Sequence, residues 1–415
     1  MHRGAAPPPS PPLPRQVKLF GWVSLLNDFA SEMIYPLLPA FVTGVLGAGP
    51  QALGALDGAA EFAAAFVKLG AGRLADRVPL RGPMIVLGYF IAVVVRPVIA
   101  ITGAAWQVIG LRVVDRLGKG LRTPPRDALI ADATPPALAG RAFGLQRGMD
   151  HAGAVLGPLA AWYLLASGTA NVRAVIGWSL VPGVAVLVLA VWAVRGGKGG
   201  RGGNGRQGAA PSATVSPAAP AAFAAPAALV AISAFYLLRM PDTLIILRSQ
   251  QLGIPVAVVP LLWAAVHVVR SSSSFLGGAA TDRLGPGRTM WVGWLVYAVL
   301  ALGMARATTA AGAWALFLGM GLVAGLTESP ERALVARLAG PGGHQGSGFG
   351  VYHGATGLAA LVGGLALGAV YQAGGAGGAG GGAGGPRAFI ASATLGGLLA
   401  LVSAAHYLRR KEGPT

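Results

Sequence analysis

Acidic and basic side chains interrupt several apolar segments of this sequence, at spacings that place them on shared helix faces. Asp28 and Glu32 are one helical turn apart, and Asp57, Glu61 and Lys68 share a face in the next segment. Burial in an apolar medium favours the neutral form of a carboxyl group, whereas a nearby arginine favours the charged form. A carboxyl group whose surroundings alternate between these two cases can load and release a proton near neutral pH.

Charges of the same kind occur further along the chain. The residues that we predict to line a proton or substrate pathway are Asp28, Glu32, Glu61, Arg112, Asp115 and Asp150. Two interpretations stay open. In one, at least one of Asp28, Glu32 and Glu61 exchanges protons. In the other, the charges form structural ion pairs between helices, and Glu32 or Glu61 simply neutralises Arg112.

The segments that carry these charges are long and apolar. Of the 415 residues, 54% are apolar and only 11% are charged, whereas a soluble domain carries about 25% charged residues. About 20 mostly apolar residues span a bilayer as a helix. We predict twelve such helices, near 19–46, 53–73, 83–103, 105–132, 141–165, 174–194, 225–251, 255–280, 288–307, 311–338, 346–371 and 388–408. The predicted fold class is an all-α polytopic membrane protein.

The basic residues are distributed unevenly between the loops. A net charge of +18 could indicate nucleic-acid binding, but that function needs a basic face on a soluble module. Counted from a cytoplasmic N-terminus, the inner loops include Arg73, Arg141, Arg195, Lys198 and Arg201, whereas the outer loops hold little beyond Arg173, Arg306 and Arg387. This bias predicts a multi-pass protein of the bacterial cytoplasmic membrane, with both termini cytoplasmic and no nucleic-acid partner.

Composition divides the chain into five parts. We predict a disordered proline-rich tail (1–18), a six-helix half (19–194), a cytoplasmic linker rich in Gly, Pro and Ala (195–224), a second six-helix half (225–408) and a short cytoplasmic tail (409–415). The chain has no cysteine, which excludes disulfides and thiolate metal sites.

The two halves repeat each other. "GRLADRVPLR" at 72–81 matches "GAATDRLGPGR" at 278–288, and "TPPRDALIAD" at 123–132 is echoed by "ESPERALVAR" at 328–337. The same spacing separates Asp76 from Arg126 and Asp282 from Arg332. A duplicated six-helix unit has an even number of helices, so the two halves share one orientation in the membrane.

On these motifs the sequence resembles the major facilitator superfamily over nearly its whole length. Its signature between helices two and three is similar to Gly72, Asp76, Arg77 and Arg81, and the second half repeats it at Asp282, Arg283 and Arg288. Arg112 stands where proton-coupled members place a buried arginine on helix four. Gly153, Gly157 and Pro158 resemble the helix-five antiporter motif. The resemblance implies two parallel six-helix halves that alternate access to a central cavity.

The motif residues also carry physical expectations. Asp76 and Arg81 should act on the inner gate, with Arg81 reaching Asp127 or Asp132 at the inner end of helix four. The paired inner ends of helices four and ten supply Arg126, Asp127, Glu331 and Arg332. Gly157 and Pro158 should break or kink helix five, and its glycines should permit close contact with the opposite half.

The expected function is secondary active transport, most specifically H+-coupled efflux of a small organic compound by a monomer. Uptake of a metal, a metal complex or a nutrient is the alternative within transport. A polytopic membrane enzyme would need a sizeable loop at the membrane surface, and no outer loop is long enough. We therefore predict no catalytic residue, no cofactor and no bound metal. The absence of a "GxxxxGK[ST]" motif argues against direct use of ATP.

Overall fold

The computed structural model describes residues 12–75, 78–135, 138–196, 226–338, 345–374 and 383–412, and these residues form helices without any strand. The first half of the chain contains α1 (Arg15–Ile34), η1 (Tyr35–Leu37), η2 (Ala40–Val45), α2 (Pro50–Ala75), α3 (Val78–Val98), η3 (Ile99–Ile101), α4 (Ala105–Ala133), α5 (Ala139–Ala166), α6 (Val172–Trp178) and α7 (Leu180–Gly196). The second half contains α8 (Pro226–Leu238), α9 (Asp242–Gln251), η5 (Val256–Val258), α10 (Val259–Leu284), α11 (Pro286–Arg306), α12 (Ala310–Leu338), α13 (Gln345–Ala373) and α14 (Gly384–Glu412).

Within these ranges the helices group into the twelve spans expected from hydropathy, so the predicted fold class is confirmed. Eight of the spans are long and apolar enough to cross a membrane by length and composition. The other four are α2, α4, α5 and the span that α1 begins, which carry most of the intramembrane charges of the first half. Charged side chains thus lower the mean hydropathy of the four spans in which they gather.

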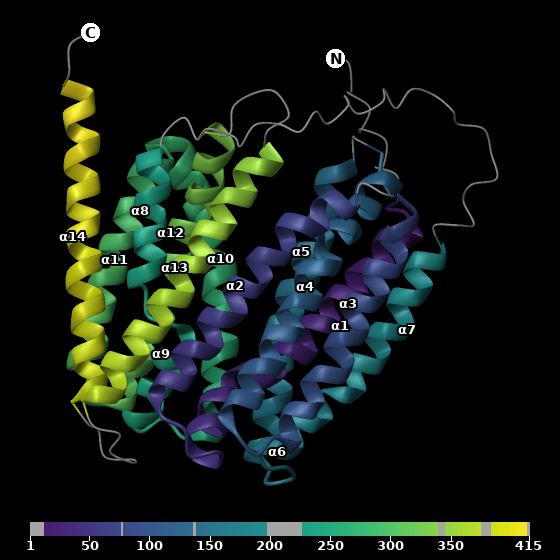
Figure 1. Cartoon of the computed structure of the whole chain (residues 1–415), viewed down its shortest axis with the longest axis horizontal. Helices are drawn as coiled ribbons and strands as arrows, with labels where there is room; N and C mark the ends of the chain where they lie inside the picture. Colours follow the sequence, from purple (N-terminus) through teal and green to yellow (C-terminus); the bar gives the residue numbers. More distant parts are fainter. Residues whose placement is uncertain are drawn as a thin grey trace, which may run out of the picture.

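The two halves lie side by side, with α1–α7 on the right of Figure 1 and α8–α14 on the left. The start of α1 and the end of α14 lie at the same end of the bundle, at the top of the figure. We call this the terminal end and the other one the opposite end. In this arrangement α2 runs from the opposite end toward the terminal end, and α13 runs the other way.

The internal repeat is visible in the packing of equivalent helices. A Cβ atom on Gly120 of α4 would lie 2.9 Å from the Cβ of Val67 on α2. In the second half, a Cβ atom on Gly321 of α12 would lie 2.9 Å from a γ carbon of Val269 on α10. Each half therefore uses a glycine on its fourth span to bring the second span within van der Waals contact.

The seventh span is broken at its middle, whereas hydropathy predicts one continuous helix. α8 ends at Leu238, and α9 begins at Asp242 directly after Pro241. Proline restricts the residue before it to extended backbone, which ends the first helix. The N–H group of Met240, freed by the break, donates to the hydroxyl oxygen of Tyr297 at 2.7 Å. The break places the N-terminus of α9 inside the bundle.

Helix α5 differs from expectation in two respects. It is one continuous helix from Ala139 to Ala166 with Pro158 inside it, so of the expected break or kink at this proline the break is wrong, and the kink stays a prediction. Its glycines pack against α1 of the same half, not against the opposite half. A Cβ atom on Gly153 would overlap the carbonyl oxygen of Leu25, and one on Gly157 would overlap that of Phe29.

The closest glycine-mediated contact between the halves joins α2 and α13. A Cβ atom on Gly54 would overlap the carbonyl oxygen of Gly364, and one on Gly58 would lie 2.8 Å from the Cα of Leu361. These residues belong to the part of each helix nearer the opposite end. The halves are therefore packed tightly together on that side.

Candidate functional site

A cavity of about 370 Å³ lies between the two halves. Its lining includes Tyr35, Asp57, Glu61 and Lys68 from the first two spans, Arg116 from α4, Tyr236, Arg239, Asp242 and Arg270 from α8–α10, and Glu328, Arg332, Tyr352, His353 and Thr356 from α12 and α13. Glu328 and Arg332 lie in the second half of α12, toward the terminal end, and about half of each side chain is exposed. The cavity is thus reached from the terminal end and closed by α2 and α13 at the opposite end.

Helix α2 contributes three charged side chains along one face of the cavity. Asp57, Glu61 and Lys68 of α2 all line it, as their helical spacing predicted. Glu61 is exposed on the cavity wall, and its charge interacts with those of Arg116 and Lys68. Two cations of the first half therefore face this one acid.

The second half contributes a cluster around Asp242, the first residue of α9. Arg270 Nη2 lies 2.9 Å from Asp242 Oδ2, and Arg239 Nη2 lies 3.8 Å from Asp242 Oδ1. The guanidinium carbon of Arg270 lies 5.1 Å from the centroid of the Trp263 ring, within range of a cation–π interaction. One carboxylate is shared by two guanidinium groups.

Glu32 makes a contact between the halves. Trp263 Nε1 of α10 donates to Glu32 Oε2 at 2.9 Å, and His267 Nε2 lies 3.6 Å from the same oxygen. Less than one fifth of the Glu32 side chain is exposed. Since α1 and α10 belong to different halves, any relative movement of the halves changes what surrounds this carboxyl group.

Asp57 makes a second contact between the halves, close to the glycine contact of α2 and α13. Its Oδ2 accepts from the backbone N–H of Thr243 at 3.1 Å and from the Thr243 hydroxyl at 2.8 Å, while Tyr35 donates to its Oδ1 at 3.0 Å. Thr243 is the second residue of α9, so the break in the seventh span exposes the donors that Asp57 takes.

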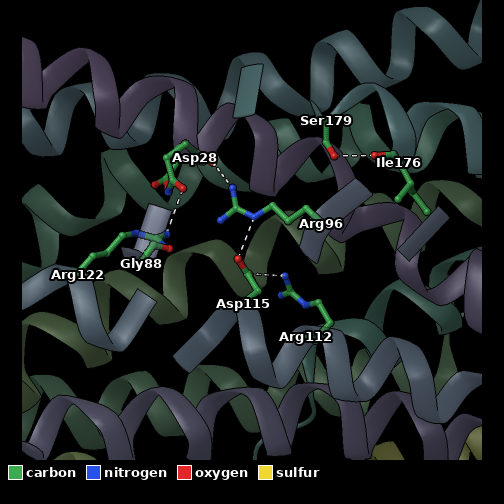
Figure 2. A network of polar contacts seen from close by, with 9 residues as sticks. Asp28, Gly88, Arg96, Arg112, Asp115, Arg122, Ile176 and Ser179 are labelled. Carbon is green, nitrogen blue, oxygen red and sulfur yellow. Dashed lines mark hydrogen bonds and ion pairs between the residues drawn. The ribbon is translucent and has the colours of Figure 1, made fainter. Parts of the chain in front are cut away.

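A buried ion cluster lies within the first half (Figure 2). Asp115 Oδ1 accepts from Arg96 Nε at 3.0 Å, and its Oδ2 lies 3.3 Å from Arg112 Nη1. All three side chains are at most 5% exposed. Arg96 also donates to the backbone carbonyl of Asn27, and Arg122 donates to the amide oxygen of the same asparagine. The cluster ties α3, α4 and α1 together.

The predicted pathway residues therefore fall into two groups, those that line the cavity and those that do not. Glu61 lines the cavity, whereas Asp28, Glu32, Arg112, Asp115 and Asp150 are not part of its lining. The expectation that Glu32 or Glu61 neutralises Arg112 is wrong, because Asp115, three residues later on the same helix, takes that position. Asp28 accepts from the Asn27 amide at 2.9 Å, and Asp150 lies 3.9 Å from Arg147.

The motif residues at the helix ends are placed as follows. Arg81 forms an ion pair with Asp132, one of its two expected partners. Asp76 and Arg77 lie outside the described residues, and Gly72 belongs to α2. Asp282 and Arg283 are exposed at the end of α10, and Arg288 lies in the first turn of α11.

The inner ends of α4 and α12 are not equivalent. Arg126 pairs with its neighbour Asp127 at 2.9 Å, and Arg332 lies 3.6 Å from Glu328. Glu331 is buried and accepts from the hydroxyl groups of Tyr236 at 3.1 Å and Tyr352 at 2.9 Å. These two tyrosines also line the cavity, so Glu331 fixes part of its wall.

Sequence reasoning missed several residues of the site. Arg96 and Trp263 each hold a predicted pathway carboxylate but carry no motif of their own. A charged residue inside an apolar span, in the last turn of α3, was the available signal for Arg96. Trp263 offers no such signal, because tryptophan is ordinary in membrane helices and its partner comes from a distant span.

The comparison with known families decides the identity. The profile of the Major Facilitator Superfamily matches residues 20–364. The chain belongs to this superfamily. An uncharacterized MFS-type transporter of Methanocaldococcus jannaschii is 27% identical over 362 residues, covering 87% of this chain and 89% of that protein. The multidrug resistance protein MdtH of Photorhabdus laumondii is 32% identical over 142 residues, covering 34% of this chain and 35% of MdtH.

Solved structures of the superfamily share the fold. A POT family transporter in complex with a thioalcohol-conjugated peptide superposes with a TM-score of 0.75 at 11% identity, covering 95% of this chain and 96% of that one. A D-xylose–proton symporter superposes with a TM-score of 0.66 at 16% identity, covering 93% and 96%. At this identity the likeness establishes the fold alone.

Proposed function

We propose that this superfamily member is a secondary active transporter that couples efflux of a small organic compound to H+ by alternating access. The observation that carries the proposal is the charged cavity between the halves, reached from one end and closed at the other. A cavity that opens alternately to each side needs contacts between the halves that can break and re-form. Asp57–Thr243 and Glu32–Trp263 are such contacts.

The proposed coupling site is Glu32. Protonation removes the charge that attracts His267 and, at longer range, Arg116. The contact with Trp263 and His267 then weakens, and the halves can separate at the opposite end. The distribution of basic loop residues supports assigning the terminal end to the cytoplasm. The partial likeness to MdtH, whose name assigns it to multidrug resistance, supports efflux as the direction.

Transport in everted membrane vesicles tests the function. We expect vesicles that contain the protein to accumulate at least one member of a chemically mixed panel when a pH gradient is imposed, because everted vesicles turn efflux into uptake. Collapse of the gradient with a protonophore should abolish accumulation. Empty-vector vesicles are the control, and accumulation that survives the protonophore would argue against proton coupling.

Replacement of Gly54 with Leu tests the closure of the opposite end. A side chain here would collide with Gly364 of α13, and overpacking of this kind costs about 1–3 kcal/mol. We expect the population to shift by about tenfold or more toward the state open at the opposite end. The chain has no cysteine, so a single cysteine replacing Ala360 in the cavity reports access through maleimide labelling.

The matched control is Gly110→Leu. Gly110 lies on the exposed surface of α4, where a Cβ atom would have no neighbour within 4 Å. Labelling from the opposite end should rise in Gly54→Leu and stay at the starting level in Gly110→Leu. Equal labelling in both variants would mean that the α2–α13 contact does not control access.

A further inference from the structure

We propose that the cavity binds an organic anion, with its acidic group held by Arg270 and Arg239 and its apolar part held against the aromatic wall. The inference rests on the proposed function and adds a substrate class to it. It follows from the balance of charges in the cavity, the geometry of the Asp242 cluster and the position of the aromatic rings.

The charges that line the cavity do not cancel. Five cations, Lys68, Arg116, Arg239, Arg270 and Arg332, face four carboxylates, Asp57, Glu61, Asp242 and Glu328. Arg332 and Glu328 pair with each other near the terminal end. Asp57 is engaged by hydrogen bonds from Tyr35 and Thr243 at the side nearer the opposite end. The lining thus keeps one cation more than it has carboxylates, and on the second half Arg239 and Arg270 share the single carboxylate of Asp242.

The excess of positive charge comes from the second half, which lines the cavity with three arginines and two carboxylates. Arg270 and Arg239 share Asp242, and the two ion pairs differ in length, 2.9 Å against 3.8 Å. Arg270 Nε is buried and has no hydrogen-bond partner among the described residues. A guanidinium group presents its donors in a planar fork that fits a carboxylate or similar oxyanion. A ligand acid can take the donors that Asp242 leaves unused.

Arg270 is also held in place by the Trp263 ring. Its guanidinium group lies over the Trp263 ring, and only 18% of its side chain is exposed. A cation already oriented by an aromatic ring and a carboxylate loses little conformational freedom when it binds a ligand. The guanidinium group of Arg270 is therefore preorganised to bind an anion.

The rest of the wall indicates an organic rather than an inorganic anion. Tyr35, Tyr236 and Tyr352 line the same cavity, and the volume of about 370 Å³ lies at the lower end of small-molecule sites. Aromatic side chains bind planar apolar groups through their faces and edges. A small compound with one acidic group and one planar apolar part matches the arginines and the tyrosines of this lining.

The charge of such a substrate agrees with the proposed direction. A membrane potential that is negative inside favours the movement of an anion out of the cytoplasm. Efflux of the anion in exchange for H+ would draw on the potential and on the pH gradient together. An organic cation would instead meet a cavity with excess positive charge.

Binding to the purified full-length protein tests the substrate class. The probes are matched triples of carboxylic acid, neutral amide and primary amine built on several aromatic ring systems, beginning with 1-naphthoate, 1-naphthamide and 1-naphthylmethylammonium, measured by isothermal titration calorimetry. We expect at least one acid to bind about tenfold or more tightly than its own amide, and the amines to bind worst, because a charge-assisted hydrogen bond is worth about one decade of affinity or more.

Two variants of opposite effect locate the site. Arg270→Gln should remove the preference for the acid over the amide. Asp242→Asn should increase the affinity for the acid, since it removes the internal carboxylate that competes for the same donors. The control is Arg306→Gln, an exposed arginine at the end of α11, which should leave binding unchanged.

The inference is overturned if no acid binds more tightly than its amide across the panel, including the case in which nothing binds. It is also overturned if Arg270→Gln and Asp242→Asn both keep the starting preference. Gradient-driven transport of a neutral or cationic compound with no anion preference would remove the substrate class while leaving the transporter function in place. Absence of any gradient-driven transport would count against the function itself.

Discussion

Glu32→Gln is expected to abolish transport driven by a pH gradient while leaving exchange of substrate across the same membrane intact. Glutamine keeps the size of the side chain and can still accept the hydrogen bond from Trp263 Nε1, so the contact between α1 and α10 can form. It cannot gain or lose a proton. A carrier that moves substrate but has lost its proton-binding group retains exchange and loses coupling.

The surroundings of Glu32 give the physical reason. In the structure closed at the opposite end, its carboxylate faces Trp263 and His267 of α10, and the charge of Arg116 on α4 also acts on it. In the proposed transport cycle the halves separate on that side, these groups move away and water replaces them. The change of partners alters the free energy of the charged form, which is what coupling requires.

Paired assays on one reconstituted preparation measure this effect. The rate of gradient-driven uptake should fall by at least about tenfold in Glu32→Gln, a factor that corresponds to a free-energy difference of about 1.4 kcal/mol. The rate of exchange should stay within about twofold of that of the starting protein. Asp28→Asn and Glu61→Gln are the parallel variants. Full gradient-driven transport in Glu32→Gln would make Glu32 a structural contact, and loss in one of the parallel variants would transfer the coupling role to that acid.

The twelve spans and their duplication could be predicted because both depend on local sequence. Hydropathy over about 20 residues identifies a span without knowledge of its neighbours, and the repeated "DR" motifs fix the register of the two halves. The break in the seventh span depends on an equally local cause, Pro241, which hydropathy ignores. Pro241 itself indicates the break, because a helix usually ends at or before the residue that precedes a proline.

The partners of the buried charges could not be predicted in the same way. Helical spacing places Asp28 and Glu32 on one face, but the direction in which that face points depends on the rotation of α1 within the bundle. Glu32 meets Trp263, which lies 231 residues further along the chain. The pair of Arg112 and Asp115 could have been predicted from their spacing of three residues on one helix, at which opposite charges meet, but we expected Glu32 or Glu61 as the partner of Arg112.

The glycines of α5 illustrate the same limit. Their sequence pattern indicates close approach of another helix, and the structure confirms close approach. The helix that approaches is α1 of the same half, and the helix that meets the other half through glycines is α2. A small-residue pattern identifies the kind of contact but carries no information on which helix makes it.

Asp115→Ala should cause the largest loss of stability of any single change in the described residues of the site. It leaves the guanidinium groups of Arg96 and Arg112 buried beside each other without their shared counter-charge. Breaking a buried ion pair by removing one partner costs about 3–5 kcal/mol. The expected result is a strong fall in the yield of folded protein and in its melting temperature, measured by size-exclusion chromatography of heated, detergent-solubilised samples. Asp132→Ala, which removes a largely exposed partner of Arg81, is the control and should change neither.

A triple variant separates the charge imbalance from a more general loss of packing. Replacing Asp115 with Leu and both Arg96 and Arg112 with Met removes all three charges and keeps most of the volume. Buried ion clusters replaced by apolar residues of similar size are often as stable as the original. The triple variant should therefore recover most of the stability that Asp115→Ala loses, although the hydrogen bond from Arg96 to the Asn27 carbonyl is absent. A triple variant as unstable as Asp115→Ala would show that the hydrogen bonds of the cluster, more than its charge balance, hold α1, α3 and α4 together. If it is stable and still transports, the cluster has a structural role, and proton coupling does not pass through Arg112 or Asp115.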